Sequence, residues 1–443
     1  MAVRSGELET IRGAATPLLN VPRDYNVLLE AIGERRIVLL GEASHGTHEF
    51  YQQRAEITKR LIVEKDFQAV AVEADWPDAD RVNRFVQLRG EDREATDALA
   101  DFRRFPAWMW RTADVLDFVG WLREHNEKHT RAQVGFYGMD LYSLHSSIAA
   151  VLEYLAKIDP AAAERARERY ACFEHYGEDP QAYGYAAAAG LDGCEDEVTE
   201  QLLELRRRAA HYARLDGRVA EDEFFSAEQN ARLATNAEAY YRAMYRGRAS
   251  SWNLRDQHMT DTLQALDEHL SRDGGPAKLV VWAHNSHLGD ARATEMWKQG
   301  EHNVGQLVRE SWGMDSFLVG FTTFSGTVTA STDWDGPAER KQVRPALPDS
   351  VEDLFHSIGI SDFLLVPSTD VEVARVLTQP RLERAIGVLY RPETERWSHY
   401  FHAVLSRQFD AVIHFDHTRA VEPLEGGSLW VADEAPHTFP STY

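Results

Sequence analysis

A short turn in the first tenth of the chain holds an acid and an imidazole in a setting that suits proton transfer. The segment Gly41-Glu42-Ala43-Ser44-His45-Gly46 follows directly after an apolar run. Glycine adopts backbone angles that other residues resist, so the two flanking glycines could let this turn push His45 outward. A general base needs an orienting acid and a fixed position. The pattern therefore predicts that His45 is a general base and that an acid, either Glu42 or the later Glu73, orients its ring.

Other apolar runs are followed by polar residues in the same way. Asp75 and Pro77 fit the first positions of a helix. The nearby Glu73 has no such capping role, so it is a candidate for the active site. Ligands of open α/β sheets bind outside the carboxyl ends of the strands. We therefore expect one rim of a sheet to collect Glu42, His45, Glu73, Asp140, His284 and His287. Asp140 and the nearby Tyr142 are expected to bind the substrate.

Missing motifs narrow the chemistry. The sequence has no G-x-S-x-G nucleophile elbow, no H-E-x-x-H zinc helix, no Walker phosphate loop and no G-x-G-x-x-G. Ser44 precedes His45 directly, and adjacent residues in a turn seldom form a hydrogen-bonded nucleophile and base. The mechanism that remains is attack by a water molecule, which either a base or a metal ion activates. We therefore expect no required cofactor, although the histidines and carboxylates could also hold a divalent metal.

The elements that must position these residues alternate in type. Short runs rich in β-branched residues predict buried strands, and helical spacing, as in Val115, Phe118, Val119 and Leu122, separates several of them. This alternation predicts an α/β fold with a largely parallel or mixed sheet flanked by helices. The predicted strands are Arg36–Leu40, Ala69–Val72, Val134–Tyr137, Lys278–Trp282, Phe317–Phe321, Phe363–Val366, Ile386–Tyr390 and Ala411–Phe415.

A long middle region shows helical periodicity and almost no strand signal. It runs from about residue 146 to 270, between two predicted strands, and would suit a cap over the strand ends, although a purely structural subdomain explains it as well. We therefore divide the chain into residues 1–145 as the N-terminal half of the α/β core, 146–270 as a helical insert or lid, and 271–443 as the C-terminal half of the core.

Composition excludes several classes of protein. The 443 residues are 44% hydrophobic and 27% charged, which is ordinary for a globular chain, and the formal net charge of -23 disfavours binding to nucleic acid or anionic membranes. The two cysteines, Cys172 and Cys194, rule out a disulfide framework but leave one bridge open. No secretory signal or membrane span is evident, so a cytoplasmic location is expected. Aromatic residues such as Phe105, Trp108 and Trp110 belong to the core or to an apolar pocket.

Six segments resemble the erythromycin esterase family. They are GEASHGTHEFYQQR, VAVEADWP, GFYGMDLYSL, SSWNLRDQHM, VVWAHNSHLGD and ERWSHYFHAVLSRQFDAVIHFDHT, and they occur in the same order as in the family across nearly the whole chain. This resemblance implies a hydrolase that cleaves a macrolactone ester through water without an acyl-enzyme, and some family members are sensitive to chelators. It implies that Glu42, His45, Arg54 and Glu73 are the active-site acid, base, arginine and second acid.

The resemblance also allows roles to be stated. Arg54 would orient a carboxylate or stabilise the developing oxyanion, and His284 or His287 would protonate the leaving alkoxide. Asn253 and Arg255, where the helical insert returns to the sheet, would line the cleft. The expected partner is a small ester or lactone, and a metabolic ester is as good a candidate as a macrolide.

Two other functions stay open. A metal-dependent hydrolase would use His45, Glu73, His284 and His287 as ligands and would lose activity on chelation. A non-catalytic protein would use the same histidines to hold a metal or haem without turnover. The two acids beside His45 favour chemistry over ligation, because ligation needs no base of tuned pKa.

Overall fold

A computed structural model describes residues 2–130, 132–176, 179–190, 193–212, 217–271 and 275–425. Nine strands form one sheet in the order β1-β8-β11-β6-β2-β5-β3-β4, with β7 paired to β6, and two more form a separate two-stranded antiparallel sheet. The strands are β1 Thr16–Pro17, β2 Ile37–Leu40, β3 Ala69–Asp75, β4 Gly135–Asp140, β5 Leu279–Trp282, β6 Ser316–Ala330, β7 Glu339–Val343, β8 Asp362–Leu365, β9 Arg381–Arg384, β10 Tyr400–Ala403 and β11 Ala411–Thr418.

The centre of this sheet is parallel. Strands β11, β6, β2, β5, β3 and β4 all run in one direction, whereas β8, β1 and β7 pair antiparallel at the margins. The predicted α/β class with a mixed sheet flanked by helices is confirmed. Because the parallel strands end along the same edge, residues that follow β2, β3, β4 and β5 are brought together there.

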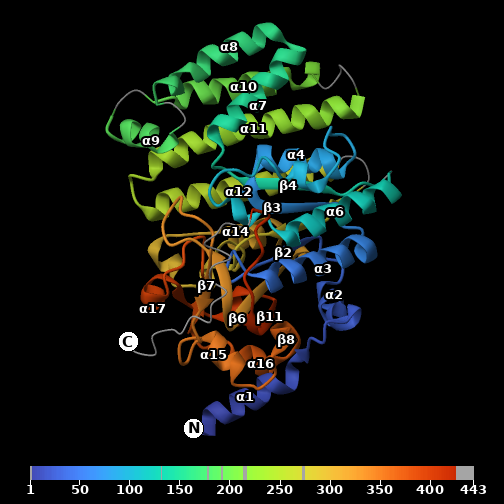
Figure 1. Ribbon diagram of the computed structural model, residues 1–443, viewed down its shortest axis with the longest axis vertical. Coiled ribbons are helices and arrows are strands. Elements are labelled where there is room, and N and C mark those ends of the chain that lie inside the picture. The colour runs from blue at the N-terminus through green and yellow to red at the C-terminus, as the bar shows by residue number, and fades with distance from the viewer. Residues whose placement is uncertain are drawn as a thin grey trace.

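Helices cover both faces of the sheet (Figure 1). Alternate residues of β2 point to opposite sides: Ile37 and Leu39 join one hydrophobic core, and Val38 and Leu40 join the other. The helices are α1 Ala2–Ala14, α2 Asn26–Ile32, α3 His48–Lys65, α4 Trp76–Val86, α5 Ala95–Ala98, α6 Ala113–Lys128, α7 Leu144–Ile158, α8 Pro160–Tyr170, α9 Pro180–Ala188, α10 Glu195–Tyr212, α11 Gly217–Ala243, α12 Arg248–Leu270, α13 Asn285–Leu288, α14 Val304–Trp312, α15 Val351–His356, α16 Val371–Val376, α17 Glu395–Ser398 and α18 Leu405–Gln408.

The helical region between β4 and β5 comprises α7 to α12. Helices α7 to α11 lie at one end of the long axis of the molecule, and α1, α15 and α16 lie at the other (Figure 1). Helix α12 packs against β4 and α14, and its first turns reach the carboxyl ends of the strands. The division of the chain into domains at residues 146 and 270 stays a prediction.

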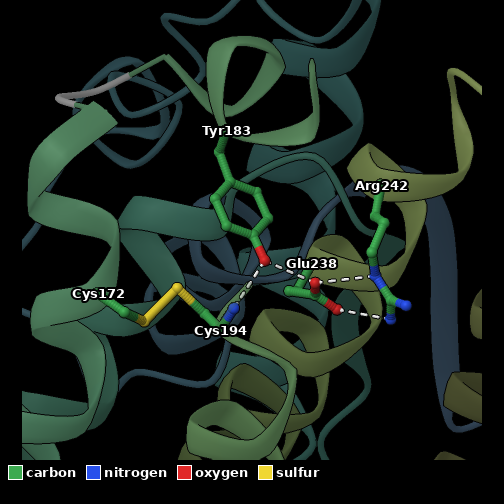
Figure 2. Close-up of a disulfide and its surroundings, with 5 residues drawn as sticks. All are labelled: Cys172, Tyr183, Cys194, Glu238 and Arg242. Carbon is green, nitrogen blue, oxygen red and sulfur yellow. Dashed lines mark hydrogen bonds and ion pairs between the residues drawn. A yellow bond between two sulfur atoms is a disulfide. The ribbon is translucent and has the colours of Figure 1, made fainter. Parts of the chain in front are cut away.

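One disulfide closes a loop within this helical region. Cys172 and Cys194 are bonded, with their Cα atoms 5.9 Å apart. The backbone N–H of Cys194 donates to the hydroxyl of Tyr183 at 2.9 Å, and that hydroxyl donates to Glu238 at 2.6 Å (Figure 2). Glu238 is also paired with Arg242, so the bridge and this polar network attach α9 and the start of α10 to α11.

One predicted strand is wrong. Residues 386–390 form only isolated bridges, of which the first joins Ile386 to Ser44. The N–H of Ile386 donates to Ala43 and its carbonyl accepts from His45, so this apolar segment supports the turn that holds His45. A run of apolar residues buried against a turn gives the same sequence signal as a strand, which explains the error.

The described helices include none that is both long enough and apolar enough to cross a membrane.

Candidate active site

The turn after β2 places His45 against a buried ion pair. The Nδ1 atom of His45 lies 2.9 Å from Oε1 of Glu42, and Oε2 of Glu42 lies 2.8 Å from Nη2 of Arg54. Glu42 and Arg54 are both fully buried, and the guanidinium lies over the rings of Tyr51 and Trp282 at 4.3 and 5.2 Å. Because Glu42 accepts from Nδ1, the Nε2 atom of His45 is left free to act as a base.

Close packing, rather than unusual backbone angles, explains the two glycines of this turn. Neither Gly41 nor Gly46 has a positive φ angle. A Cβ atom on Gly46 would lie 1.8 Å from the carbonyl oxygen of Thr329, and one on Gly41 would lie 2.1 Å from Oδ1 of Asn285. The expectation that these glycines supply special dihedral angles is therefore wrong, although the positions do require glycine.

Arg255 joins the acids at the ends of β3 and β4. It donates from Nη2 to Oε1 of Glu73 at 2.7 Å, and from Nη2 and Nε to the two oxygens of Asp140 at 2.6 and 2.9 Å. Its Nη1 atom lies 3.0 Å from Nε2 of His287. All of these groups are largely buried, so their mutual charges are weakly screened. Arg255 is thus the cation at the centre of the cluster.

His287 belongs to a second histidine–carboxylate pair. Its Nδ1 atom contacts both oxygens of Asp256, at 2.9 and 3.0 Å, and its Nε2 atom lies 3.4 Å from Oε1 of Glu73. The indole of Trp252 stacks on the imidazole, with centroids 4.4 Å apart and planes 7° apart. The same oxygen of Glu73 lies 4.0 Å from Nε2 of His45. Two imidazoles therefore converge on one carboxylate oxygen.

His284 occupies a different environment. Its Nδ1 atom contacts the hydroxyl of Ser286 at 2.8 Å and accepts from the N–H of that residue at 3.2 Å, as an N-cap of α13. Its own N–H donates to Oε2 of Glu73 at 2.8 Å. Burial and the neighbouring His45 lower the pKa of His284 to about 3. His284 therefore remains neutral and fixes Glu73 through its backbone.

Electrostatics distinguish His45 from His284. Burial lowers the pKa of His45, but the carboxylates of Glu73 and Glu42 outweigh burial and raise that pKa above its ordinary value of 6.5. Burial acts to raise the pKa of Glu73, yet the charges of His287, Arg255 and His45 hold it well below its usual range. Glu73 therefore stays ionised, and His45 has a high affinity for a proton.

These groups line a cleft with a volume of about 550 Å³. Its polar wall contains His45, Glu73, Asp140, Arg255, His284 and His287, together with Ser286 and Arg104. Aromatic side chains supply much of the remaining surface: Phe102, Phe105, Trp110, Tyr142, Trp252, Trp334, Trp397, Tyr400 and Phe401. A cleft of this kind can hold an ester with an apolar body next to fixed polar groups.

The predicted site residues divide into three groups. His45, Glu73, Asp140, Tyr142, Arg255, His284 and His287 line the cleft, as do Phe105 and Trp110. Glu42 and Arg54 lie behind His45 without facing the cleft. Asn253 does not reach the cleft, because its side chain binds the carbonyl of Gly300 and the N–H of His302, and Trp108 lies in the core.

Sequence reasoning missed Asp256 and Arg104. Asp256 follows Arg255, and the helical spacing from Trp252 to Asp256 places these residues on adjoining parts of one helix face, so this signal was available. Arg104 lies in an irregular segment, where its ion pair with Asp75 at 2.8 Å has no sequence signature. Asp75 sits at the N-cap position of α4, but its side chain binds Arg104 and the N–H of Tyr142 instead of capping the helix.

The histidine and carboxylate cluster does not fit a metal centre. Among the described residues, no group of three or more His, Cys, Asp or Glu side chains is arranged to hold a metal ion. The guanidinium of Arg255 lies where a cation would have to sit, against Oε1 of Glu73 and Nε2 of His287. We therefore assign no step to a metal.

Comparison with known proteins identifies the family of this chain. A family model described as erythromycin esterase matches residues 62–418, which include Glu73, Arg255, His284 and His287. The chain is 21% identical over 360 residues to erythromycin esterase type II of Escherichia coli, covering 76% of this chain and 82% of that relative.

Solved structures share the fold. A crystal structure of a Bacillus cereus protein superposes with a TM-score of 0.76 at 20% identity, covering 95% of this chain and 99% of the other. A mutant of the erythromycin esterase EreC in its open conformation gives a TM-score of 0.65 at 18% identity, covering 94% and 98%. Since the family model matches most of the chain, this protein belongs to the erythromycin esterase family, as its sequence motifs predict.

Proposed function

We propose that this esterase-like hydrolase cleaves a carboxylic ester or lactone with a water molecule that His45 activates, and that no covalent intermediate forms. One observation carries the proposal: Nδ1 of His45 is held by the buried Glu42, so that Nε2 remains as the proton acceptor in the cleft. His45 removes a proton from water, and the carboxylates of Glu42 and Glu73 stabilise the imidazolium that results.

Arg255 is the best-placed cation for the oxyanion. It lines the cleft and carries a permanent charge, whereas Arg54 is buried behind Glu42 and serves to hold that acid. A fixed cation that faces the reacting carbonyl stabilises the negative charge of the tetrahedral intermediate without reorganisation. We therefore assign stabilisation of the oxyanion to Arg255, and we assign to Arg54 only the orientation of Glu42.

A serine nucleophile is a weaker explanation. The hydroxyl of Ser44 is hydrogen-bonded to Thr47 and not to His45. Ser286 lines the cleft and contacts His284, but a histidine whose pKa is about 3 is a poor base for activating a hydroxyl group. Turnover should therefore survive the Ser286→Ala substitution.

The names of the relatives and the aromatic lining of the cleft both support an ester with a large apolar portion as substrate. Both a macrolide and a metabolic lactone meet this description. Substrate screening must therefore include both classes, together with simple aryl esters.

The test is hydrolysis of this panel by wild-type protein, by His45→Ala and by His48→Ala, each with and without a chelator. His48 is a matched control, since it pairs with Asp114 at 2.8 Å and does not line the cleft. We expect His45→Ala to lower kcat/KM by about 10²- to 10⁴-fold and His48→Ala to leave it unchanged. Equal rates for His45→Ala and wild type would remove His45 as the base, and loss of activity on chelation with rescue by metal would favour the metal-dependent alternative.

A further inference from the structure

A second carboxylate–histidine pair points at Glu73 in the same manner as the pair formed by Glu42 and His45. We propose that Asp256 is a positioning residue that maintains His287 as the proton donor to the leaving oxygen of the ester. The inference rests on the proposed function, since it names the acid that complements the base. In the imidazole of His287, the Nδ1 atom contacts Asp256 and the Nε2 atom faces Glu73 and Arg255.

Asp256 is itself held rigidly. It is fully buried in α12, and the N–H of Val304, the first residue of α14, donates to its Oδ1 atom at 3.0 Å. Trp252, one turn earlier on α12, stacks on the face of His287. The imidazole is thus fixed by a carboxylate at one edge and by an indole on one face, which leaves it a single orientation.

The carboxylate of Asp256 also determines which ring nitrogen of His287 carries a proton. An ionised carboxylate can only accept, so His287 carries a proton on Nδ1 in both of its protonation states. A neutral ring accepts at Nε2 from Nη1 of Arg255 at 3.0 Å, and an imidazolium can instead donate from Nε2 toward Oε1 of Glu73 at 3.4 Å. The contact with Asp256 therefore leaves Nε2 as the ring nitrogen that is turned toward the other polar groups of the cleft.

The proposed step balances without any further reactant. As the tetrahedral intermediate collapses, the bond between the acyl carbon and the alcohol oxygen breaks, and the proton on Nε2 of His287 moves to that oxygen. His45 meanwhile holds the proton taken from water. His45 then releases its proton to solvent and His287 takes one up from solvent, so that both residues regain their starting states and the net reaction is ester plus water to acid plus alcohol. His284 cannot take this role, because Ser286 engages its Nδ1 atom and its ring stays neutral.

Leaving groups of different basicity provide the test. A nitrophenolate departs without protonation, whereas an alkoxide needs an acid, so the two esters of one carboxylic acid report the acid alone. We expect Asp256→Asn to lower kcat on the alkyl ester by about 10- to 100-fold and to change kcat on the nitrophenyl ester little. His287→Gln should show the same selectivity, and the double variant should be no worse than His287→Gln. Asp261→Asn is the matched control, because Asp261 lies in the same helix and its side chain accepts from Gln257 on the same helix.

Other outcomes have distinct meanings. An equal loss on both esters with Asp256→Asn would overturn the inference and indicate a structural role for Asp256. If Asp256→Asn fails to fold, as judged by circular dichroism, Asp256→Glu retains the carboxylate and should keep the wild-type ratio of rates on the two esters, while a fallen ratio in His287→Gln remains the decisive result. A wild-type protein that hydrolyses neither ester, or that does so without His45, would instead defeat the proposed function.

Discussion

Glu42 does not face the cleft, yet its charge controls the residue that does. It is buried between the imidazole of His45 and the guanidinium of Arg54. Together with Glu73 it raises the pKa of His45 above the ordinary value despite burial. A base is active only when neutral, so the rate should rise with pH through a value above 6.5.

Substitution of Glu42 by glutamine should therefore change both the rate and its pH dependence. Loss of the carboxylate lowers the pKa of His45, so the rising limb of kcat/KM moves to lower pH, and the plateau falls by about 10- to 100-fold because the imidazolium loses a stabilising charge. The measurement is a pH–rate profile. Glu64→Gln, which removes only a surface pair with Arg60, should leave the profile unchanged. An unmoved limb in Glu42→Gln would mean that another group titrates.

The turn that carries His45 is held by strands that are remote in sequence. The long strand β6 brings Thr329 to Gly46, whose carbonyl accepts from Thr329 at 2.9 Å and from Val421 at 3.0 Å. Ile386 adds two more backbone bonds to the same turn. The geometry of the base is therefore set by packing between distant segments and not by the turn alone.

The Gly46→Ala variant tests whether close packing, rather than backbone freedom, is the reason for glycine at position 46. A methyl group at Gly46 would collide with the backbone of β6, so we expect a loss of about 1–3 kcal/mol in the free energy of unfolding together with a fall in activity. Gly120→Ala provides the contrast, because Gly120 lies inside α6 with open space around it. That variant should gain about 0.5–1 kcal/mol. Chemical denaturation measures both, and equal stability of the two variants would contradict this account.

How much the sequence predicts depends on whether a feature is local. Strand-end residues such as His45, Glu73 and His284 could be placed at one rim, because parallel strands end together. Asn253 could not be placed, since its orientation depends on a loop at residues 300–302 that comes near only after folding. The same holds for Arg104, whose partner Asp75 lies 29 residues away in sequence. Local periodicity found the parallel strands at the centre of the sheet, and long-range packing decided which side chains face the cleft.

Buried neutral histidines should make the stability of the whole protein depend on pH. Burial lowers the pKa of both His258 and His284 from 6.5 to about 3. Between those two values the unfolded chain binds more protons than the folded one, so stability must fall as the pH is lowered. Each such group contributes a slope of up to about 1.4 kcal/mol per pH unit.

Unfolding by denaturant at several pH values tests this dependence. The free energy of unfolding should decline below pH 6.5, and His258→Gln, which keeps a neutral side chain near Asn236, should reduce the slope even if it lowers stability at neutral pH. A slope that is the same in His258→Gln and in wild type would show that this histidine is not buried as a neutral group.

The order of strands in the sheet has a consequence for the growing chain. Strands β2 and β3 are separated in the sheet by β5, which is synthesised only after the whole helical region from α7 to α12. During synthesis, the edges of β2 and β3 that β5 will occupy stay open while well over a hundred further residues emerge from the ribosome. Unpaired edges of this kind bind other strands, so a nascent chain of this protein is most exposed to aggregation, and to capture by chaperones, in the interval before Leu279–Trp282 appears.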